Sequence, residues 1–367
     1  MQKNKFRILF AGGGTGGHLF PAVAVAEKIK MILPEADILF VGSKSKIEGR
    51  VVPELGFRFK SIWIKGFSRR FSMDNLIFPL RLLVSLIQSI LINITYRPKV
   101  AIGTGGYAAG PAIWASSLFG AKIILVEQNS YPGVTTKLLQ NCADEIHLSF
   151  EESKTYFKDK DKLFLTGNPV RENLTIIDKC EALKKFKLNC GLKTLLILGG
   201  SLGAKSINNT LEKNLDALID SNIQVIWQTG RDYFEMYKHL QSERVCIKDF
   251  IKNMADAYSA CDLVIARAGA TSIAEILTLG LPAILVPSPN VAENHQYYNA
   301  KSLADYGASL LLEDKDLAVK FTEVIFANLF DDLKLKTLSD KAKSLSRPQA
   351  AQIIAERAVN YVKKGAA

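Results

Sequence analysis

A histidine that directly follows a run of glycines is the first feature of this sequence that could take part in catalysis. Residues 12–17 read GGGTGG, they follow the apolar run 6–11, and His18 stands where a helical pattern begins. Glycine lets a backbone approach a ligand closely, and amides at a helix start favour anionic or polar groups. An imidazole titrates near neutral pH, so His18 could remove a proton from an attacking hydroxyl or only hydrogen-bond the loop or a substrate.

Two further glycine-rich segments also follow apolar runs that predict strands, at residues 103–107 (GTGGY) and 199–203 (GGSLG). Residues 12–17 formally contain G-x-G-x-x-G, the fingerprint of dinucleotide sites. The second predicted strand, however, ends in residues 41–43 (VGS), without the acidic residue that binds a ribose there. An NAD-dependent enzyme is therefore disfavoured, and no G-x-x-x-x-G-K-[ST] sequence supports a P-loop nucleotidase.

The segment 267–275 (RAGATSIAE) is a fourth strand-to-helix junction. Its helix start favours a diphosphate, and Glu275 lies about one helical turn further on. A carboxylate at this position can accept hydrogen bonds from a ribose diol. Glu275 also fits a structural role, as a capping-type glutamate of the first turn.

The elements that must carry these loops follow from the rhythm of apolar runs along the chain. Short apolar runs alternate with helical patterns in both halves, which predicts βαβ units and parallel sheets, an α/β fold. Because the runs 6–11 and 193–198 each lead into a glycine-rich turn, each half is expected to form its own Rossmann-like sheet. Ligands bind beyond the carboxyl ends of such strands, so a cleft lined by the glycine loops is the place to seek function.

The two halves are expected to meet near residues 167–171 (GNPVR), an extended turn that precedes a charged helix. We predict an N-terminal domain over residues 1–167 and a C-terminal domain over 168–347. A final helix within 348–367 could pack back on the first domain. The length of 367 residues suits two domains with a core each.

The amino-acid composition limits the classes of binding partner that we expect. The net charge of +11 favours phosphates, nucleic acid or an anionic lipid surface. Because the charge is spread along the chain, without a basic stretch interleaved with aromatics, no nucleic-acid partner is expected. The five cysteines are odd in number and form no C-x-x-C pair, which indicates neither a disulfide framework nor a zinc site and suits a reducing cytoplasm. The N-terminal apolar run is too short for a signal peptide, so export is not expected.

Residues 75–94 form the most apolar stretch and are nearly long enough to span a bilayer. A polar stripe at helical spacing interrupts this stretch, formed by Arg81, Ser85, Gln88, Ser89 and Asn93. An amphipathic helix with a wide apolar face is therefore predicted. The basic residues Lys65, Arg69 and Arg70 precede it. This combination is typical of a helix lying in a membrane interface, and the alternative is an ordinary core helix.

Seven ordered motifs make the sequence resemble the MurG family along essentially the whole chain. They are residues 13–18 (GGTGGH) with Pro21, 103–107 (GTGGY), 127–129 (EQN), 167–171 (GNPVR), 199–204 (GGSLGA), 267–275 (RAGATSIAE), and 295–296 (HQ) with 299–300 (NA). The resemblance implies a GT-B fold, in which two Rossmann-like domains face each other across a cleft. It implies inverting transfer of N-acetylglucosamine from UDP-N-acetylglucosamine to the C4 hydroxyl of the muramyl sugar of lipid I, giving lipid II in peptidoglycan synthesis. It also implies a peripheral protein at the cytoplasmic face of the bacterial plasma membrane, on an anionic surface and without a cofactor.

The resemblance also implies site residues. Carried over by motif, the donor site comprises Thr15, Gly16, Gly17, Asn129, Arg171, Ser201, Ile251, Ala270, Thr271, Ser272, Ile273, Ala274, Glu275 and Gln296. Within it, Ile251 would meet the uracil, Glu275 the ribose and Gln296 the sugar hydroxyls. The acceptor site comprises Gly14, His18, Gly105, Gly106 and Tyr107. His18 is the candidate catalytic base and Glu127 its alternative, while His295 departs from the paired glutamines of many relatives and its role stays open.

Two D-x-D sequences, residues 159–161 and 314–316, match the metal-binding motif of many glycosyltransferases. Both lie in charged runs, so we interpret them as solvated loops and predict no metal site. Helix starts and Arg171 would instead neutralise the charge of the leaving group.

Three alternative functions are also considered. UDP-N-acetylglucosamine 2-epimerases share the GT-B architecture, but the first glycine loop with Thr15 and His18, together with the membrane-suited helix, argues against them. Transferases that glycosylate diacylglycerol are disfavoured only by the motif set. A binder of nucleic acid or anionic lipid without turnover is disfavoured by the spread of the positive charge.

Overall fold

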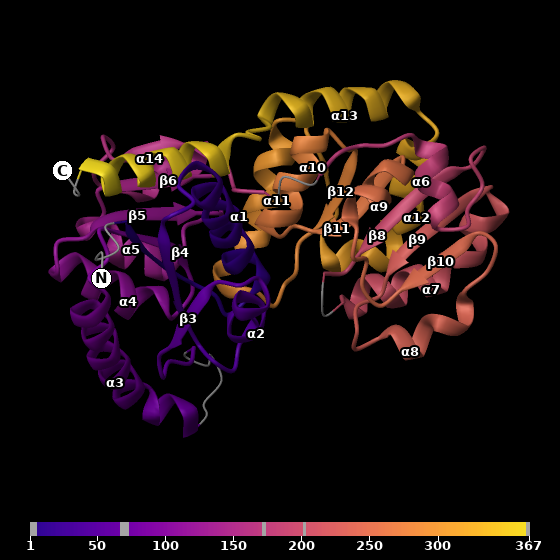
Figure 1. The fold of residues 1–367 in the computed structure, drawn as a ribbon. Coiled ribbons are helices and arrows are strands. Elements are labelled where there is room, and N and C mark those ends of the chain that lie inside the picture. Colours follow the sequence, from indigo (N-terminus) through magenta and orange to yellow (C-terminus); the bar gives the residue numbers. More distant parts are fainter. Residues whose placement is uncertain (1–5, 67–72, 171–173, 201–202, 365–367) are drawn as a thin grey trace. The chain divides into compact units, whose positions relative to one another are not determined.

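The computed structural model describes residues 6–66, 73–170, 174–200 and 203–364. The chain separates into two compact units, Met1–Arg171 with Arg347–Ala367, and Glu172–Ser346. Each unit is built on one parallel sheet with helices around it (Figure 1), as the alternation of apolar runs predicts.

A seven-stranded parallel sheet forms the centre of the first unit, in the order β3-β2-β1-β4-β5-β6-β7. Its strands are β1 (Arg7–Gly12), β2 (Asp37–Gly42), β3 (Arg58–Ser61), β4 (Val100–Gly105), β5 (Lys122–Glu127), β6 (Glu145–Leu148) and β7 (Leu163–Leu165). β1 and β4 are almost entirely buried, as expected of strands that are apolar on both faces and covered by helices on both sides. Strand order reverses between β1 and β4, so the loops after these strands flank the crevice where open parallel sheets bind ligands.

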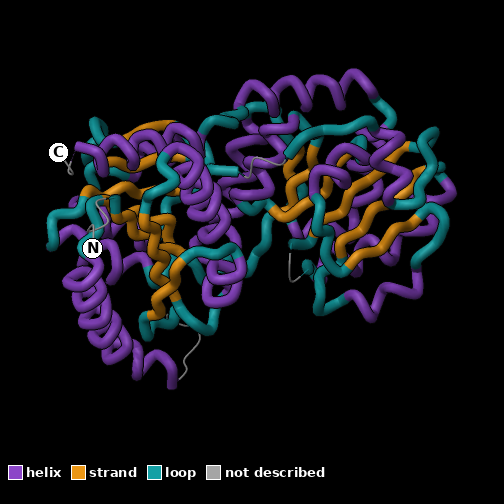
Figure 2. Tube along the Cα trace, viewed as in Figure 1, coloured by secondary structure: helices purple, strands orange, loops and turns teal. Residues whose placement is uncertain are grey.

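Helices cover both faces of this sheet (Figure 2). They are α1 (Gly16–Ile32), α2 (Ile47–Glu54), α3 (Met73–Tyr96), α4 (Ala109–Leu118), α5 (Val134–Leu139) and α14 (Ala350–Lys364), with 3-10 turns at Gln140–Cys142 and Glu151–Tyr156. One core joins Phe10 and Ile102 to α1 and α14. The other core joins Leu9 and Ala101 on the opposite face of the sheet to α3 and α4.

Helix α14 comes from the end of the chain, yet it completes the first unit. It packs against α1 and adds Ile354, Ala355, Ala358, Val359 and Val362 to the core. Arg357 binds Glu145 on β6 through two hydrogen bonds of 2.5 and 2.6 Å, and the Tyr361 hydroxyl donates to the same carboxylate at 2.7 Å. Burial raises the pKa of Glu145, but the hydrogen bonds from His147, Arg357 and Tyr361 outweigh burial and lower it to about 2. We call Glu145, Arg357 and Tyr361 the α14 latch.

A six-stranded parallel sheet forms the centre of the second unit, in the order β10-β9-β8-β11-β12-β13. Its strands are β8 (Lys193–Leu198), β9 (Ile223–Gln228), β10 (Val245–Lys248), β11 (Leu263–Arg267), β12 (Ala283–Val286) and β13 (Leu310–Leu311). Strand order reverses between β8 and β11, so the loops after these two strands flank a second crevice.

The helices of the second unit are α6 (Lys179–Lys185), α7 (Lys205–Asp220), α8 (Phe234–Tyr237), α9 (Met254–Ala260), α10 (Ala270–Leu279), α11 (His295–Asp305), α12 (Leu317–Leu329) and α13 (Asp332–Leu345). Single 3-10 turns lie at Lys238–Leu240, Ala292–Asn294 and Asp314–Asp316. On α7 the buried residues recur every three or four positions, which gives one apolar stripe against the sheet: Ile207, Leu211, Leu215 and Leu218.

One cysteine pair departs from the sequence analysis. Cys180 on α6 is bonded to Cys190, and their Cα atoms lie 5.0 Å apart. The spacing of the cysteines did not predict this disulfide, because two cysteines ten residues apart carry no signature of pairing. Cys142, Cys246 and Cys261 are free.

Candidate functional site

The loops after β1 and β4 pack directly on each other in the first unit. The Thr104 hydroxyl donates to the carbonyl of His18 at 2.7 Å. Gly105 and Gly106 have φ angles of +96° and +83°, in the left-handed region that favours glycine. A Cβ at Gly105 would lie 2.8 Å from the imidazole of His18, and one at Gly106 would collide with the carbonyl of Gly13. The structure therefore brings together the two glycine loops, with His18 between them.

The imidazole of His18 is oriented by its own loop. Its Nδ1 lies 3.3 Å from the carbonyl oxygen of Gly13 and 3.3 Å from the hydroxyl of Thr15. A carbonyl oxygen only accepts hydrogen bonds, so the contact with Gly13 favours a proton on Nδ1. Nε2 is then the basic nitrogen, and the ring edge formed by Cδ2 and Nε2 lies beside Gly105. This tautomer suits a general base that acts through Nε2.

Glu48 is a residue of this site that the sequence analysis missed. Its side chain, from α2, is 1% exposed and accepts hydrogen bonds from the amides of Gly14 at 2.8 Å and Ser43 at 2.9 Å. It therefore joins the loop after β1 to the loop after β2. The Gly14 amide donates to this carboxylate, so Glu48 shapes the loop in which the acceptor site was predicted.

Glu127, the alternative base, ends β5 and is also 1% exposed. One oxygen accepts the amide of Asn129 and the other accepts the amide of Gly133, each at 3.1 Å. The pKa of Glu127 is raised above its ordinary value because burial outweighs the hydrogen bonds from Thr136, Asn129 and Gly133, which lower it. With both oxygens engaged, this carboxylate fixes the turn 129–133 and places Asn129, which favours a positioning role over proton transfer.

The side chain of Tyr107 is half exposed beside the β4 loop. A Cβ at Gly66 would lie 2.5 Å from its ring, so the backbone at Gly66 is closely packed against it. Thr15, Gly16 and Gly17 form the start of α1, and a Cβ at Gly16 would lie 2.9 Å from the ring of Phe20.

In the second unit, Ile251 is linked to the glycine loop after β8 through one glutamine. The Ile251 amide donates to the Gln228 side chain at 2.9 Å, and Gln228 donates to the carbonyl of Gly200 at 3.3 Å. The Ile251 side chain is buried. The predicted uracil contact thus lies on a loop tied to the glycine loop.

The segment 270–275 forms the start of α10 as predicted, with Gly269 as the N-cap. Glu275 lies beyond the first turn, which contains no acidic residue. Its capping interpretation is therefore wrong. Instead, its carboxylate is half-buried and accepts a hydrogen bond of 2.7 Å from the hydroxyl of Tyr258.

Helix α11 contributes Gln296 to the same edge of the sheet. The Gln296 side-chain oxygen accepts the amide of Ser288 at 2.9 Å, which leaves its amide nitrogen as the group that can donate to a sugar hydroxyl. Asn299 is fully buried and donates to the carbonyl of Ala268 at 3.3 Å, so α11 is tied to the loop that precedes α10. His295 is the first residue of α11 and is half-buried.

The interpretation of residues 314–316 as a solvated loop is wrong for Asp314. Its carboxylate is 21% exposed, lies 2.5 Å from the Arg267 guanidinium and accepts the Ser206 hydroxyl at 2.7 Å. Arg267 also donates to the carbonyls of Val286 and Pro287. Asp314 therefore fixes the end of β11. Among the described residues there is no group of three acidic, histidine or cysteine side chains that could hold a metal ion.

Arg171 and Ser201, both predicted in the donor site, lie outside the described residues, as do Arg69 and Arg70 before α3.

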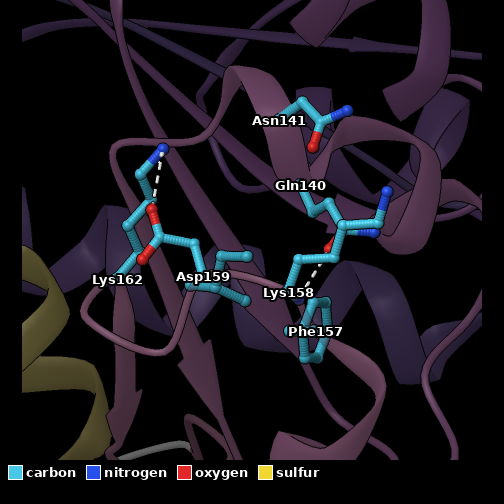
Figure 3. Close-up of a pocket in the computed structure, with 7 residues that line it drawn as sticks. Gln140, Asn141, Phe157, Lys158, Asp159 and Lys162 are labelled. Atoms are coloured by element: carbon cyan, nitrogen blue, oxygen red, sulfur yellow. Dashed lines mark hydrogen bonds and ion pairs between the residues drawn. The ribbon is translucent and has the colours of Figure 1, made fainter.

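A small cavity of about 110 Å³ lies in the first unit, away from these residues (Figure 3). It is lined by Gln140, Asn141, Ile146, Phe157, Lys158, Asp159 and Lys162. Within it, the Lys158 amide donates to the Gln140 side chain and Lys162 pairs with Asp159 at 3.6 Å. It contains none of the predicted site residues.

Comparison with known protein families gives a match for each of the two units. Residues 8–148 match the glycosyltransferase family 28 N-terminal domain, and residues 194–354 match the C-terminal domain of that family. A UDP-N-acetylglucosamine–N-acetylmuramyl-(pentapeptide) pyrophosphoryl-undecaprenol N-acetylglucosamine transferase of Flavobacterium psychrophilum is 42% identical over 98% of both chains. An enzyme of the same name from Parabacteroides distasonis is also 42% identical, over 98% of this chain and 99% of its own.

Solved structures of glycosyltransferases and of a related fold also align with this chain. The crystal structure of Acinetobacter baumannii MurG aligns with a TM-score of 0.74 and 25% identity, over 97% of this chain and 99% of its own. The complex of Staphylococcus aureus MnaA with UDP aligns with a TM-score of 0.68 over 98% and 97% of the two chains, but at 12% identity it shows the shared fold alone. These matches confirm the predicted GT-B fold, and the chain belongs to the MurG family of glycosyltransferases, within glycosyltransferase family 28.

Proposed function

We propose that this enzyme transfers N-acetylglucosamine from UDP-N-acetylglucosamine to the muramyl sugar of undecaprenyl-pyrophosphoryl-N-acetylmuramyl-pentapeptide, a step of peptidoglycan synthesis. The observation that carries the proposal is the 42% identity to transferases of this name over 98% of the chain. The catalytic geometry is consistent with it, because the family's glycine loops and His18 lie together at the switch point of the first sheet.

In the proposed reaction, the C4 hydroxyl of the muramyl sugar attacks the anomeric carbon of the donor sugar, and UDP leaves with inversion. The Nε2 atom of His18 accepts the proton of that hydroxyl, because the loop orients Nδ1 toward Gly13. Glu127 and Glu48 hold the surrounding turns, through the amides of Gly133, Asn129 and Gly14.

The donor is proposed to bind at the carboxyl edge of the second sheet. Ile251 would meet the uracil, Glu275 the ribose diol and Gln296 the sugar hydroxyls. The amides at the start of α10 would face the diphosphate, since a helix N-terminus favours anions. In the described part of the chain, the buried hydroxyl of Thr271 in this turn lacks a hydrogen-bond partner, and a phosphate oxygen could supply one.

The direct test incubates purified protein with radiolabelled UDP-N-acetylglucosamine and, separately, the muramyl-pentapeptide lipid or diacylglycerol. We expect label in the product of the first acceptor only, with full activity in excess chelator. Label in diacylglycerol alone would reassign the acceptor, and conversion of the free UDP-sugar to its 2-epimer without acceptor would show an epimerase. Strict dependence on magnesium would contradict the metal-free mechanism.

We also propose peripheral attachment to the cytoplasmic face of the plasma membrane through α3. By length and composition, residues 76–96 of this helix could cross a membrane. The polar residues Ser85, Ser89 and Asn93 are fully buried, and each donates to a carbonyl of its own helix. Large apolar side chains face outward instead: Leu76, Leu80, Leu83, Ile87, Leu91 and Ile94 are all at least 45% exposed.

This orientation is the reverse of that expected for a soluble helix, in which the polar face meets water. The polar face is held inward against the first unit, and the apolar face that remains exposed suits the acyl boundary of a lipid surface. Trp63, 47% exposed beside Arg81, and the exposed Lys65 supply an aromatic ring and a charge of the kind that lie at headgroup depth.

A vesicle assay tests this attachment. Wild-type protein should sediment with anionic vesicles and be released as salt is raised, while Leu83→Glu should bind much more weakly because it places a charge in the apolar face. The exposed Leu333, on α13 of the second unit, offers a control, and Leu333→Glu should bind as the wild type does. Equal binding by both variants and wild type would remove α3 as the anchor.

A further inference from the structure

One buried tyrosine has no role in the proposed reaction as described above. Tyr258 lies on α9 and is 1% exposed, and its hydroxyl donates to Glu275 at 2.7 Å. Burial and the Glu275 carboxylate raise the pKa of Tyr258 far above its usual value. The phenol therefore stays protonated at physiological pH and acts as a hydrogen-bond donor to this carboxylate.

The hydroxyl of Tyr258 is held on a fixed support. Helix α9 packs on α6, and Lys185 of α6 binds Asp256 of α9 at 2.7 Å. The Ser259 hydroxyl, next to Tyr258, accepts the amide of Ile177 at 3.0 Å. Asp262, two residues after the end of α9, accepts the amide of Thr194 on β8 at 2.7 Å. Three separate contacts thus fix the short helix that carries the phenol.

A carboxylate on a helix surface rotates about its terminal bonds unless something holds it, and a diol needs acceptor atoms in a defined plane. Tyr258 holds one oxygen of Glu275, Oε2, at a fixed point. This contact restricts the positions open to the other oxygen before any ligand arrives, and a preset acceptor avoids part of the cost of ordering it during binding.

We propose that Tyr258 is a positioning residue for nucleotide recognition, which presets the Glu275 carboxylate to receive the two hydroxyls of the donor ribose. The inference rests on the proposed contact of Glu275 with the ribose and extends it to selection of ribose over deoxyribose. Tyr258 does not itself touch the nucleotide. It acts through Glu275.

Calorimetry on the full-length protein with UDP and with 2′-deoxy-UDP tests the inference without a lipid acceptor. Tyr258→Phe keeps the ring in the core and removes only the hydroxyl. We expect it to weaken UDP binding about tenfold, the loss of one hydrogen bond to a charged group, and to reduce the preference for UDP over 2′-deoxy-UDP. In the transfer assay the donor KM should rise with little change in kcat.

Tyr237→Phe is the matched control. Tyr237 is also a fully buried tyrosine of the second unit, and its hydroxyl donates at 2.7 Å to Asn209, which is not a predicted site residue. This variant should bind both nucleotides as the wild type does. If Tyr258→Phe also binds both as the wild type does, Tyr258 only packs the core and the inference is wrong.

Glu275→Ala and the double variant separate the inference from its premise. If Tyr258 acts through Glu275, then Tyr258→Phe adds nothing in the Glu275→Ala background. A further loss of binding in the double variant would overturn the positioning role. If Glu275→Ala keeps the full preference for ribose, the proposed ribose contact is wrong and the inference fails with it. If Glu275→Ala loses that preference but Tyr258→Phe binds both nucleotides as the wild type does, the ribose contact stands and only the inference about Tyr258 is wrong.

Discussion

At the carboxyl edge of the first sheet stand three ionisable side chains, His18, Glu48 and Glu127, close to two glycine loops. At the same edge of the second sheet lies the predicted donor segment 270–275, whose one acidic side chain, Glu275, is hydrogen-bonded to Tyr258. Both edges arise from the same strand order around a switch point. Under the proposed function, one architecture therefore serves two tasks, proton transfer in the first unit and recognition of a nucleotide in the second, and the side chains at each edge determine the task.

Removal of His18 should produce the largest effect. General-base removal typically costs about 10² to 10⁴ in rate, so His18→Ala should lower kcat by that order with UDP binding nearly unchanged. Steady-state kinetics and a pH profile at saturating acceptor check this. A kcat within a few fold of wild type, with the same pH profile, would show that His18 is not the base and would make Glu127 the leading candidate.

Truncation of Glu275 should have the next largest effect, on binding instead of turnover. Glu275→Ala leaves the ribose hydroxyls unpaired, at a cost of about 1 to 3 kcal/mol, so the donor KM should rise while kcat changes little. Kinetics with varied UDP-N-acetylglucosamine measure both constants. An unchanged KM would mean that Glu275 has no part in recognition of the nucleotide.

A smaller effect is expected for Glu127. In Glu127→Gln one oxygen still accepts an amide, but the new amide group faces another N–H, so the turn 129–133 is disturbed. We expect a loss of about tenfold in kcat/KM, as for one unsatisfied buried group, with the pH profile of kcat retained. A loss larger than that of His18→Ala, with an altered pH profile, would make Glu127 the base.

The α14 latch should affect stability alone. In Arg357→Ala the buried Glu145 carboxylate keeps only His147 and Tyr361 as partners; because Arg357 is itself 36% exposed, the cost near pH 7 is about 1 to 3 kcal/mol. The folded pKa of about 2 lies below the usual 4.5, so the stabilisation is complete above pH 4.5 and is lost as the pH falls toward 2. Urea unfolding at pH 7 and pH 3 should show a smaller difference between variant and wild type at pH 3. If the difference is the same at both pH values, Arg357 stabilises the fold by packing alone. In a separate measurement, the transfer kinetics of the folded variant should match those of the wild type.

The sequence predicted the parallel sheets and the glycine loops because both depend on local patterns, an apolar run followed by a turn. It did not reveal Glu48, which lies within the charged run 44–50 (KSKIEGR) and is buried only because two loops donate amides to it. Asp314 was misread for the same reason, since its partner Arg267 is 47 residues away. Local charge cannot show which acidic residue meets a distant donor.

The orientation of α3 also could not be predicted from the sequence. Its periodicity shows a polar and an apolar face, but not which face meets the protein. Only the packing shows that Ser85, Ser89 and Asn93 are buried. Likewise, the partner of Glu275 is 17 residues away on another helix, and no spacing rule links Tyr258 to it.

The return of α14 to the first unit also affects how the protein folds as it is made. The core of that unit includes Ile354, Ala355, Ala358 and Val359, which are synthesised only after the second unit. The second unit, residues 172–346, is therefore synthesised in full while the first still exposes the apolar surface of α1 that α14 will cover. Nascent chains that stop before α14 should accordingly need chaperones for their N-terminal half, although that half was the first to emerge.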